Sequence, residues 1–158
     1  MAVVKFYLND PDAPKTTRPA HLGVNAIILW DNKLLLEKRR DSNTWGLIGG
    51  GVKRNESQLQ AITREIYEEL GFRVQHHCFT KIGVYGDPGR IAAYQDGSVW
   101  RMVIIMYKLK LSEKPTLQIS KESNDIQFFS KEELKCIEIA PTHRDIICDH
   151  FLKQGSQG

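Results

Sequence analysis

Residues 50–72 read GGVKRNESQLQAITREIYEELGF, and the acidic residues of this stretch carry most of the information in the chain. Glu65, Glu68 and Glu69 stand at positions i, i+3 and i+4, which share one face of a helix. Gly71 predicts the end of that helix, so the carboxylates fall in its last turns, at the negative end of the helix dipole. Like charges at this spacing repel by roughly 0.2–0.5 kcal/mol per pair. A divalent cation on this face would offset the repulsion, because magnesium prefers carboxylate oxygens.

The residues around the glutamates predict where the helix lies. Ser57, with Gln60 three residues later, resembles a capping box, so we expect the helix from about Asn55 or Ser57 to Leu70. An apolar stripe suited to packing on a sheet accompanies it: Leu59, Ile62, Ile66 and Leu70. The glutamate face is centred roughly 90–100° from this stripe. The carboxylates are therefore expected beside the core, not in open solvent.

The remaining segments predict strands separated by turns. Asp31-Asn32 is a hairpin turn signal, and Pro141 opens a predicted C-terminal helix that runs through Leu152. Ser130–Leu134 is expected to be a capped helical turn. A short N-terminal strand is expected before Asn9, and further strands are expected in the following segments: 24–30, 33–38, 72–74, 78–85, 100–111 and 126–129. Helices among hairpin-forming strands predict a mixed sheet in an α/β sandwich.

Three consecutive glycines, 49–51, precede the helix. Such a run marks either a tight bend after a strand or a backbone that another group approaches closely. No Gly-Lys-Ser/Thr follows, which excludes a P-loop.

Length and composition set further limits. The chain has 158 residues, 41% hydrophobic and 26% charged, which suits a single globular domain over 1–153 with a flexible tail at 154–158. A net charge of +3 is too small to indicate duplex nucleic acid as a partner. The three cysteines form no CxxC pair, which argues against a zinc site and suits a reducing cytoplasm. No apolar run is long enough for a membrane span. His143 and His150 are expected at the surface of the C-terminal helix.

The full spacing of the glycine–glutamate segment resembles that of one known family. Its fixed residues match the Nudix box, G-x5-E-x7-R-E-U-x-E-E-x-G-U, where U is apolar: Gly50, Glu56, Arg64, Glu65, Ile66, Glu68, Glu69, Gly71 and Phe72. The Leu-Leu-Leu run ending in Arg39-Arg40 and the tryptophan Trp45 also look like the family. One departure is Ile48, where members commonly carry proline. The resemblance implies a Nudix-like α/β/α sandwich with a mixed β-sheet.

The resemblance further implies hydrolysis of a nucleoside diphosphate linked to another group, by a water that divalent metal activates. Glu65 and Glu69 would be the principal ligands of Mg²⁺, for which Mn²⁺ could substitute. Glu68 would bind a further ion or assist, and a backbone carbonyl at Gly50 could complete the coordination. Arg64 would orient the glutamates by charge pairing.

Two carboxylates have less settled roles. Glu56 is metal-linked or an orienting partner, unless it is only a favourable charge at a helix N-terminus. Glu122 precedes the last strand, where some family members carry their general base, and it is expected as base or extra ligand. The alternative for Glu122 is an ordinary surface carboxylate.

Substrate selection lies outside the box, where the sequence says less. Arg40, Tyr85, Arg90 and Trp100 are candidate contacts, because aromatic rings can stack on a base and arginines can bind phosphate. By similarity to the family, the expected substrate is a small nucleotide: an ADP-ribose-like conjugate or a nucleoside triphosphate, including oxidised ones. A nucleotide-sensing module without turnover is the alternative. A homodimer is left open, although no interface stripe is evident.

Overall fold

The computed structural model describes residues 3–153 of the chain, so the predicted tail at 154–158 lies outside the described residues. Helical turns outside the α-helices are written η. The elements in chain order are β1 (Val4–Leu8), β2 (His21–Trp30), β3 (Lys33–Arg39), β4 (Trp45–Gly46), β5 (Ile48–Gly51), α1 (Gln58–Leu70), η1 (His76–Cys78), β6 (Thr80–Tyr85), β7 (Arg90–Tyr94), β8 (Val99–Lys110), β9 (Ser123–Phe129), η2 (Glu133–Cys136), α2 (Pro141–Ile147) and η3 (Cys148–Leu152).

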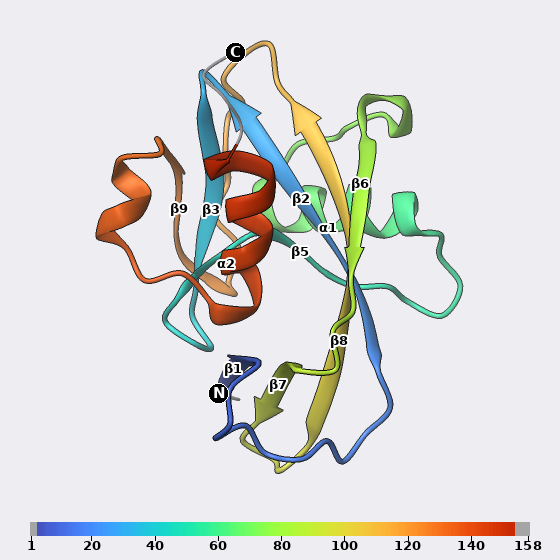
Figure 1. The fold of residues 1–158 in the computed structure, drawn as a ribbon. Coiled ribbons are helices and arrows are strands. Elements are labelled where there is room, and N and C mark those ends of the chain that lie inside the picture. Colours follow the sequence, from blue (N-terminus) through green and yellow to red (C-terminus); the bar gives the residue numbers. More distant parts are fainter. Residues whose placement is uncertain (1–2, 154–158) are drawn as a thin grey trace.

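The strands form a mixed, curled sheet between two helical layers. β8 pairs in parallel with β2 and antiparallel with β6 and β7, while β3 is antiparallel to β2, β4 and β9. Figure 1 shows α2 in front of the sheet and α1 behind it. The predicted α/β/α sandwich is therefore confirmed.

Each face of the sheet carries its own apolar core. The cluster under α1 joins Ile62 and Ile66 of the helix to Leu35 of β3, and all three are fully buried. The cluster under α2 joins Ile146 and Ile147 to the neighbouring strand residues Leu34 and Leu36. Successive β3 side chains thus point to opposite faces, so both faces of this strand are covered.

Local signals account for the ends of α1 and for the β2–β3 hairpin. The Ser57 side chain accepts a bond from the Gln60 N–H and the Gln60 side chain accepts one from the Ser57 N–H, completing the predicted capping box. Gly71 ends the helix with φ +86° in the left-handed region. Asp31 and Asn32 both have positive φ, the pattern of a type I′ hairpin turn.

The strand expected at 72–74 is wrong. Phe72 and Val74 pack partly buried against the α1 cluster, while their backbone joins no strand of the described sheet. Their apolar character reflects packing under the helix end and not strand pairing. The predicted C-terminal helix is confirmed, with Pro141 in its first turn and its last turn, η3, widened to π-helical geometry. Among residues 3–153, no helix is both long and apolar enough to cross a membrane.

The end of α1 gives a stability prediction. Alanine at Gly71 must adopt the left-handed region, and its Cβ would lie 2.7 Å from Gln118 Oε1. Gly97 also has positive φ, at +90°, but nothing lies within 4 Å of a Cβ there. We expect Gly97→Ala to lower the free energy of unfolding by about 1–2 kcal/mol, and Gly71→Ala to lower it by more. Urea unfolding of both variants measures the difference, and equal losses would contradict the proposed contact with Gln118.

Candidate active site

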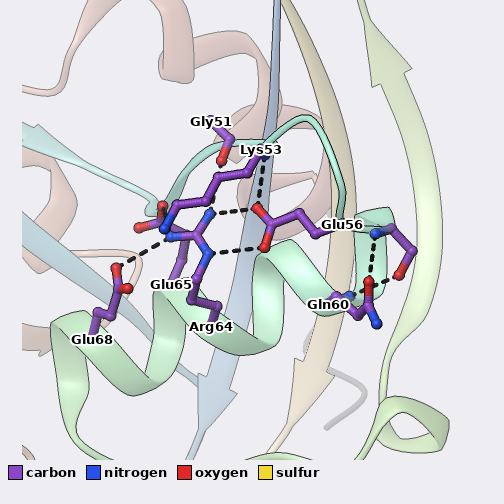
Figure 2. A network of polar contacts seen from close by, with 8 residues as sticks. Gly51, Lys53, Glu56, Gln60, Arg64, Glu65 and Glu68 are labelled. Atoms are coloured by element: carbon purple, nitrogen blue, oxygen red, sulfur yellow. Dashed lines mark hydrogen bonds and ion pairs between the residues drawn. The ribbon is translucent and has the colours of Figure 1, made fainter.

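Arg64 is the centre of a network of carboxylates at the entrance and on one face of α1 (Figure 2). Its Nη2 donates to Glu56 Oε1 at 2.6 Å and its Nε to Glu56 Oε2 at 3.0 Å, a two-point contact. Its Nη1 donates to Glu65 Oε1 at 2.9 Å and to Glu68 Oε2 at 3.2 Å. The guanidinium therefore holds three of the box carboxylates in place, as a planar donor group can.

The Arg64 network also ties the helix to the glycine loop. Nη2 of Arg64 donates to the Gly51 carbonyl at 3.0 Å, and the Lys53 N–H donates to Glu56 Oε1 at 2.8 Å. The hydrogen bonds from Arg64 lower the pKa of Glu56 to about 2. Glu56 therefore has the contacts of an orienting partner of Arg64, which is one of the three roles considered for it.

Glu69 lies in a different environment from the other glutamates. Its side chain belongs to the buried residues of α1 and is only 6% exposed, because it follows Ile66 by three positions on the edge of the apolar stripe. Burial raises the pKa of Glu69 well above its usual range, and the carboxylates of Glu37 and Glu65 add to this effect. By contrast, 53% of the Glu68 side chain is exposed. Two of the three helix carboxylates are therefore turned inward, and one faces solvent.

Neighbouring groups approach the backbone of the glycine run so closely that a side chain would not fit there. A Cβ on Gly50 would overlap the Glu65 carboxylate, and a Cβ on Gly49 would overlap the Val24 carbonyl of the paired strand. Of the two readings of these glycines, the structure favours a backbone that other groups approach closely. The Gly50 peptide consequently lies against the carboxylate predicted to bind metal.

Glu37, on β3, is a buried carboxylate that was not among the predicted site residues. It is 3% exposed, its Oε2 accepts a 2.8 Å hydrogen bond from Ser123 Oγ, and its carboxyl group lies within hydrogen-bonding reach of Glu69. The available signal was a charged residue two positions after Leu35, on the strand face that packs under α1. A carboxylate at a core-facing strand position is unusual, and it therefore indicates a candidate site residue.

Glu122 and Arg40 lie side by side where β9 and β3 adjoin. The Arg40 N–H donates to the Glu122 carbonyl at 3.0 Å, and Arg40 Nε donates to Asn124 at 3.1 Å. Both side chains are exposed. Glu122 directly precedes Ser123, whose hydroxyl bonds Glu37, so Glu122 lies near the carboxylate cluster. Burial raises the pKa of Glu37, and the negative charge of Glu122 adds a smaller effect in the same direction.

The aromatic and arginine candidates separate into two groups. Trp100 is half-buried and packs edge-to-face on His21 at 5.8 Å, and a Cβ on Gly51 would touch that histidine ring. Arg90 is fully buried and bonded to Asp145 and to the Thr142 carbonyl of α2, and Tyr85 donates to Asp149 at 2.7 Å. The structure thus brings Trp100 near the glycine loop. It gives Arg90 and Tyr85 contacts that tie β6 and β7 to the C-terminal helix.

His143 requires a correction, because it is 7% exposed and not a surface residue. Its Nδ1 accepts a 3.0 Å hydrogen bond from the Leu47 N–H, and the Leu47 carbonyl accepts one from Asn25 at 3.2 Å. Burial lowers the pKa of His143 to about 3, so the ring is neutral with its proton on Nε2. The missed signal was long-range: the partner of His143 is 96 residues away in sequence. His150, the other predicted surface histidine, is partly buried against Tyr85.

An open hollow of about 490 Å³ lies at the entrance of α1, beside Glu56. Its volume falls within the roughly 300–1,000 Å³ of small-molecule sites. The lining residues are Leu22, Val52, Glu56, Ser57, Gln58, Leu59 and Tyr107.

The residues present fit a hard divalent cation by their chemistry. Glu69 Oε2 is buried and has no hydrogen-bond partner among the described residues, and carboxylates of Glu37 and Glu65 lie beside it. Across residues 3–153, however, no group of three or more His, Cys, Asp or Glu side chains is already arranged to hold an ion. Glu65 is instead bonded to Arg64.

Comparison with known proteins shows the family. The NUDIX domain model matches residues 19–150, and the chain therefore belongs to the Nudix family. It is 30% identical over 96 residues to nucleoside triphosphatase NudI of Enterobacter sp. (strain 638), covering 60% of this chain and 67% of NudI. It is also 30% identical over 133 residues to the ADP-ribose pyrophosphatase of Methanocaldococcus jannaschii, covering 82% and 72% of the two chains. Its match to a MutT-like protein of Streptomyces ambofaciens, at 34% identity, spans 54% of each.

Solved structures agree on the fold. The NUDIX domain of Shewanella oneidensis NrtR, complexed with ADP ribose, matches with a TM-score of 0.65 at 22% identity over 87% of this chain and 88% of that one. A bifunctional NMN adenylyltransferase/ADP ribose pyrophosphatase from Francisella tularensis matches with a TM-score of 0.68 at 21% identity. This chain aligns with 43% of the Francisella protein, and the match covers 90% of this chain.

The buried His143 gives a pH prediction. Its pKa is lower in the folded chain than the roughly 6.5 of an unfolded histidine, so between about pH 6.5 and pH 3 the unfolded chain binds the extra proton. Native stability should therefore fall as pH falls through this window, by at most about 1.4 kcal/mol per pH unit from this group. His143→Gln should flatten the pH dependence of urea unfolding between pH 7 and 4.5. The exposed control, His76→Gln, should keep the wild-type slope; parallel profiles for both variants would refute the assignment.

Proposed function

We propose that this chain is a divalent-metal-dependent pyrophosphohydrolase that cleaves the diphosphate linkage of a nucleoside diphosphate derivative. The observation that carries the proposal is the buried, unpartnered Oε2 of Glu69, within a complete Nudix box and beside Glu65. A cation offsets the repulsion between such carboxylates, which a helix serving only as a scaffold would not accumulate.

Glu65 and Glu69 would hold the ion, with Glu68 and the Gly50 carbonyl as further oxygen donors. Mg²⁺ suits this all-oxygen set, and Mn²⁺ is the expected substitute. When bound, the ion supplies charge neutralisation for the phosphates and lowers the pKa of a coordinated water.

The chain's own groups do the positioning. Arg64 keeps the Glu65 and Glu68 carboxylates aimed along one side of α1, and its two-point contact with Glu56 fixes the guanidinium itself. The carboxylates are already oriented in the folded protein. Less reorganisation of these groups is then needed when phosphoryl transfer takes place. Glu122, exposed and near Glu37, is the group we propose as general base for the attacking water.

The substrate we propose is a small nucleotide: an ADP-ribose-like conjugate or a nucleoside triphosphate, including oxidised ones. Support comes from the relatives, one named as an ADP-ribose pyrophosphatase and another as a nucleoside triphosphatase. The exposed Arg40 could meet a phosphate, and Trp100 or the hollow beside Glu56 could take a nucleoside. We place the activity in one domain over 1–153 and in the cytoplasm, in keeping with three cysteines that form no disulfide.

A nucleotide panel tests the proposal and separates it from a sensing module. The chain is incubated with ADP-ribose, dinucleoside diphosphate conjugates and nucleoside triphosphates, with Mg²⁺ or with chelator, and the products are resolved by chromatography. Metal-dependent turnover of any member supports the hydrolase. Tight binding without turnover of any member would favour the sensor instead.

Replacing the inward-facing glutamate tests the ligand assignment. Glu69→Gln removes a metal-binding charge without changing side-chain size, so turnover of the best panel substrate should fall at least ~100-fold. The fold should persist, because the amide also removes a buried repulsion, and circular dichroism checks this. Glu132→Gln is the control and should keep full turnover, because the Glu132 carboxylate is exposed and paired with Lys135. Near wild-type rates for Glu69→Gln with magnesium would show that the assignment is wrong.

A further inference from the structure

The buried carboxylate of Glu37 is not part of the Nudix box and has no role in the proposed reaction so far. Glu37 follows Leu35 by two residues on β3, and Leu35 belongs to the core cluster under α1. The side chain of Glu37 therefore points at the helix layer, where it is 3% exposed. A carboxylate at such a position is costly unless something compensates it.

The Glu37 carboxyl group interacts with two residues, Ser123 of the sheet and Glu69 of the helix. Ser123 of β9 donates its hydroxyl to Glu37 Oε2 at 2.8 Å, which fixes the rotation of the carboxyl group. The same carboxyl group lies within hydrogen-bonding reach of Glu69. Glu69 thus interacts with two carboxylates from different elements, Glu65 of the helix and Glu37 of the sheet.

The protein groups around the pair leave its charge uncompensated. Arg39 is the nearby cation whose charge acts on both Glu37 and Glu69, but its Nε and Nη2 donate to Asp41 at 2.9 and 2.7 Å. Independently of the charges, Glu69 Oε2 is buried without a hydrogen-bond partner among residues 3–153, so a ligand would satisfy it.

We propose that Glu37 is an additional ligand of the divalent cation, so that the ion is held between helix α1 and the sheet. The inference rests on the proposed function, because it concerns the same ion. Three carboxylates from two elements, Glu37, Glu65 and Glu69, supply the kind of oxygen donors that Mg²⁺ and Mn²⁺ prefer. Among residues 3–153 they are not yet arranged around an ion position, so binding must draw them together. Ser123 then acts as the positioning residue that orients Glu37, in the way that ligating carboxylates are commonly hydrogen-bonded.

The competing explanation is purely structural: Glu37 and Glu69 share one proton and serve as a buried hydrogen-bonded pair. The two explanations differ in their metal dependence. A ligand contributes to cation affinity, whereas a structural pair contributes equally to stability with and without cation.

The test uses Mn²⁺ binding, which does not depend on turnover. Purified wild type, Glu37→Gln, Glu69→Gln and the exposed control Glu132→Gln are stripped with chelator and titrated with Mn²⁺ by electron paramagnetic resonance. Thermal unfolding is followed with and without Mn²⁺. Glu37→Gln should weaken Mn²⁺ binding at least ~10-fold. Its metal-free melting temperature should rise, because the new amide can donate to Glu69, and its stabilisation by Mn²⁺ should shrink.

The outcomes separate this inference from the function it rests on. Loss of Mn²⁺ binding in Glu69→Gln together with wild-type affinity in Glu37→Gln would overturn the role of Glu37 and leave the proposed metal site intact. Wild-type affinity in Glu69→Gln would overturn the metal site itself. A Glu37→Gln chain that melts lower in both conditions, with the full Mn²⁺ shift, would show the structural pair.

Ser123→Ala provides a second route in case Glu37→Gln does not fold. It removes the hydroxyl that orients Glu37 and leaves every carboxylate in place. Mn²⁺ affinity should fall by several-fold, less than in Glu37→Gln, while the Glu132→Gln control stays at the wild-type value. Unchanged affinity in Ser123→Ala would overturn the proposed orientation of Glu37.

Discussion

The site depends on the crowding of carboxylates where α1 meets the sheet. Arg64 compensates the outer members, Glu56, Glu65 and Glu68, through five short contacts that also include the Gly51 carbonyl. It does not reach the inner member, Glu69, whose buried oxygen stays without a partner among the described residues. The site therefore divides into an outer part, whose charges Arg64 compensates, and an inner carboxylate that Arg64 does not reach.

Both the helix and the sheet fix the positions of the carboxylates. The capping box and Gly71 fix the start and end of α1, so the register of its glutamates against the sheet is set locally. The glycine loop comes close because no side chain intervenes at Gly50, where the Glu65 carboxylate fills the space. On the sheet side, Glu37 is held by Ser123 of a neighbouring strand. Functional groups on regular elements are held more rigidly than groups on loops.

Features that depend on neighbouring residues could be predicted from the sequence, whereas features that depend on partners far away in the chain could not. The helix α1, its caps and the turn at Asp31-Asn32 were predictable because their signals lie within a few residues. Glu37 was missed because its partner Ser123 is 86 residues away, and His143 was misplaced because Leu47 is 96 residues away. The contact of Arg90 with Asp145 was hidden for the same reason, since the two residues are 55 positions apart.

Leu47 marks the residue at which the chain changes strand partners. β4 pairs with β3 up to Gly46, whereas β5 pairs with β2 from Ile48, so the backbone groups of Leu47 are taken by the side chains of His143 and Asn25 instead of a strand. The number of residues at this junction is therefore fixed. One inserted or deleted residue would shift the register of β5 on β2 and move the glycine run away from Glu65 of α1. Homologous chains should therefore vary in length elsewhere, as in the open connection 111–121, and keep a constant count of residues across this switch.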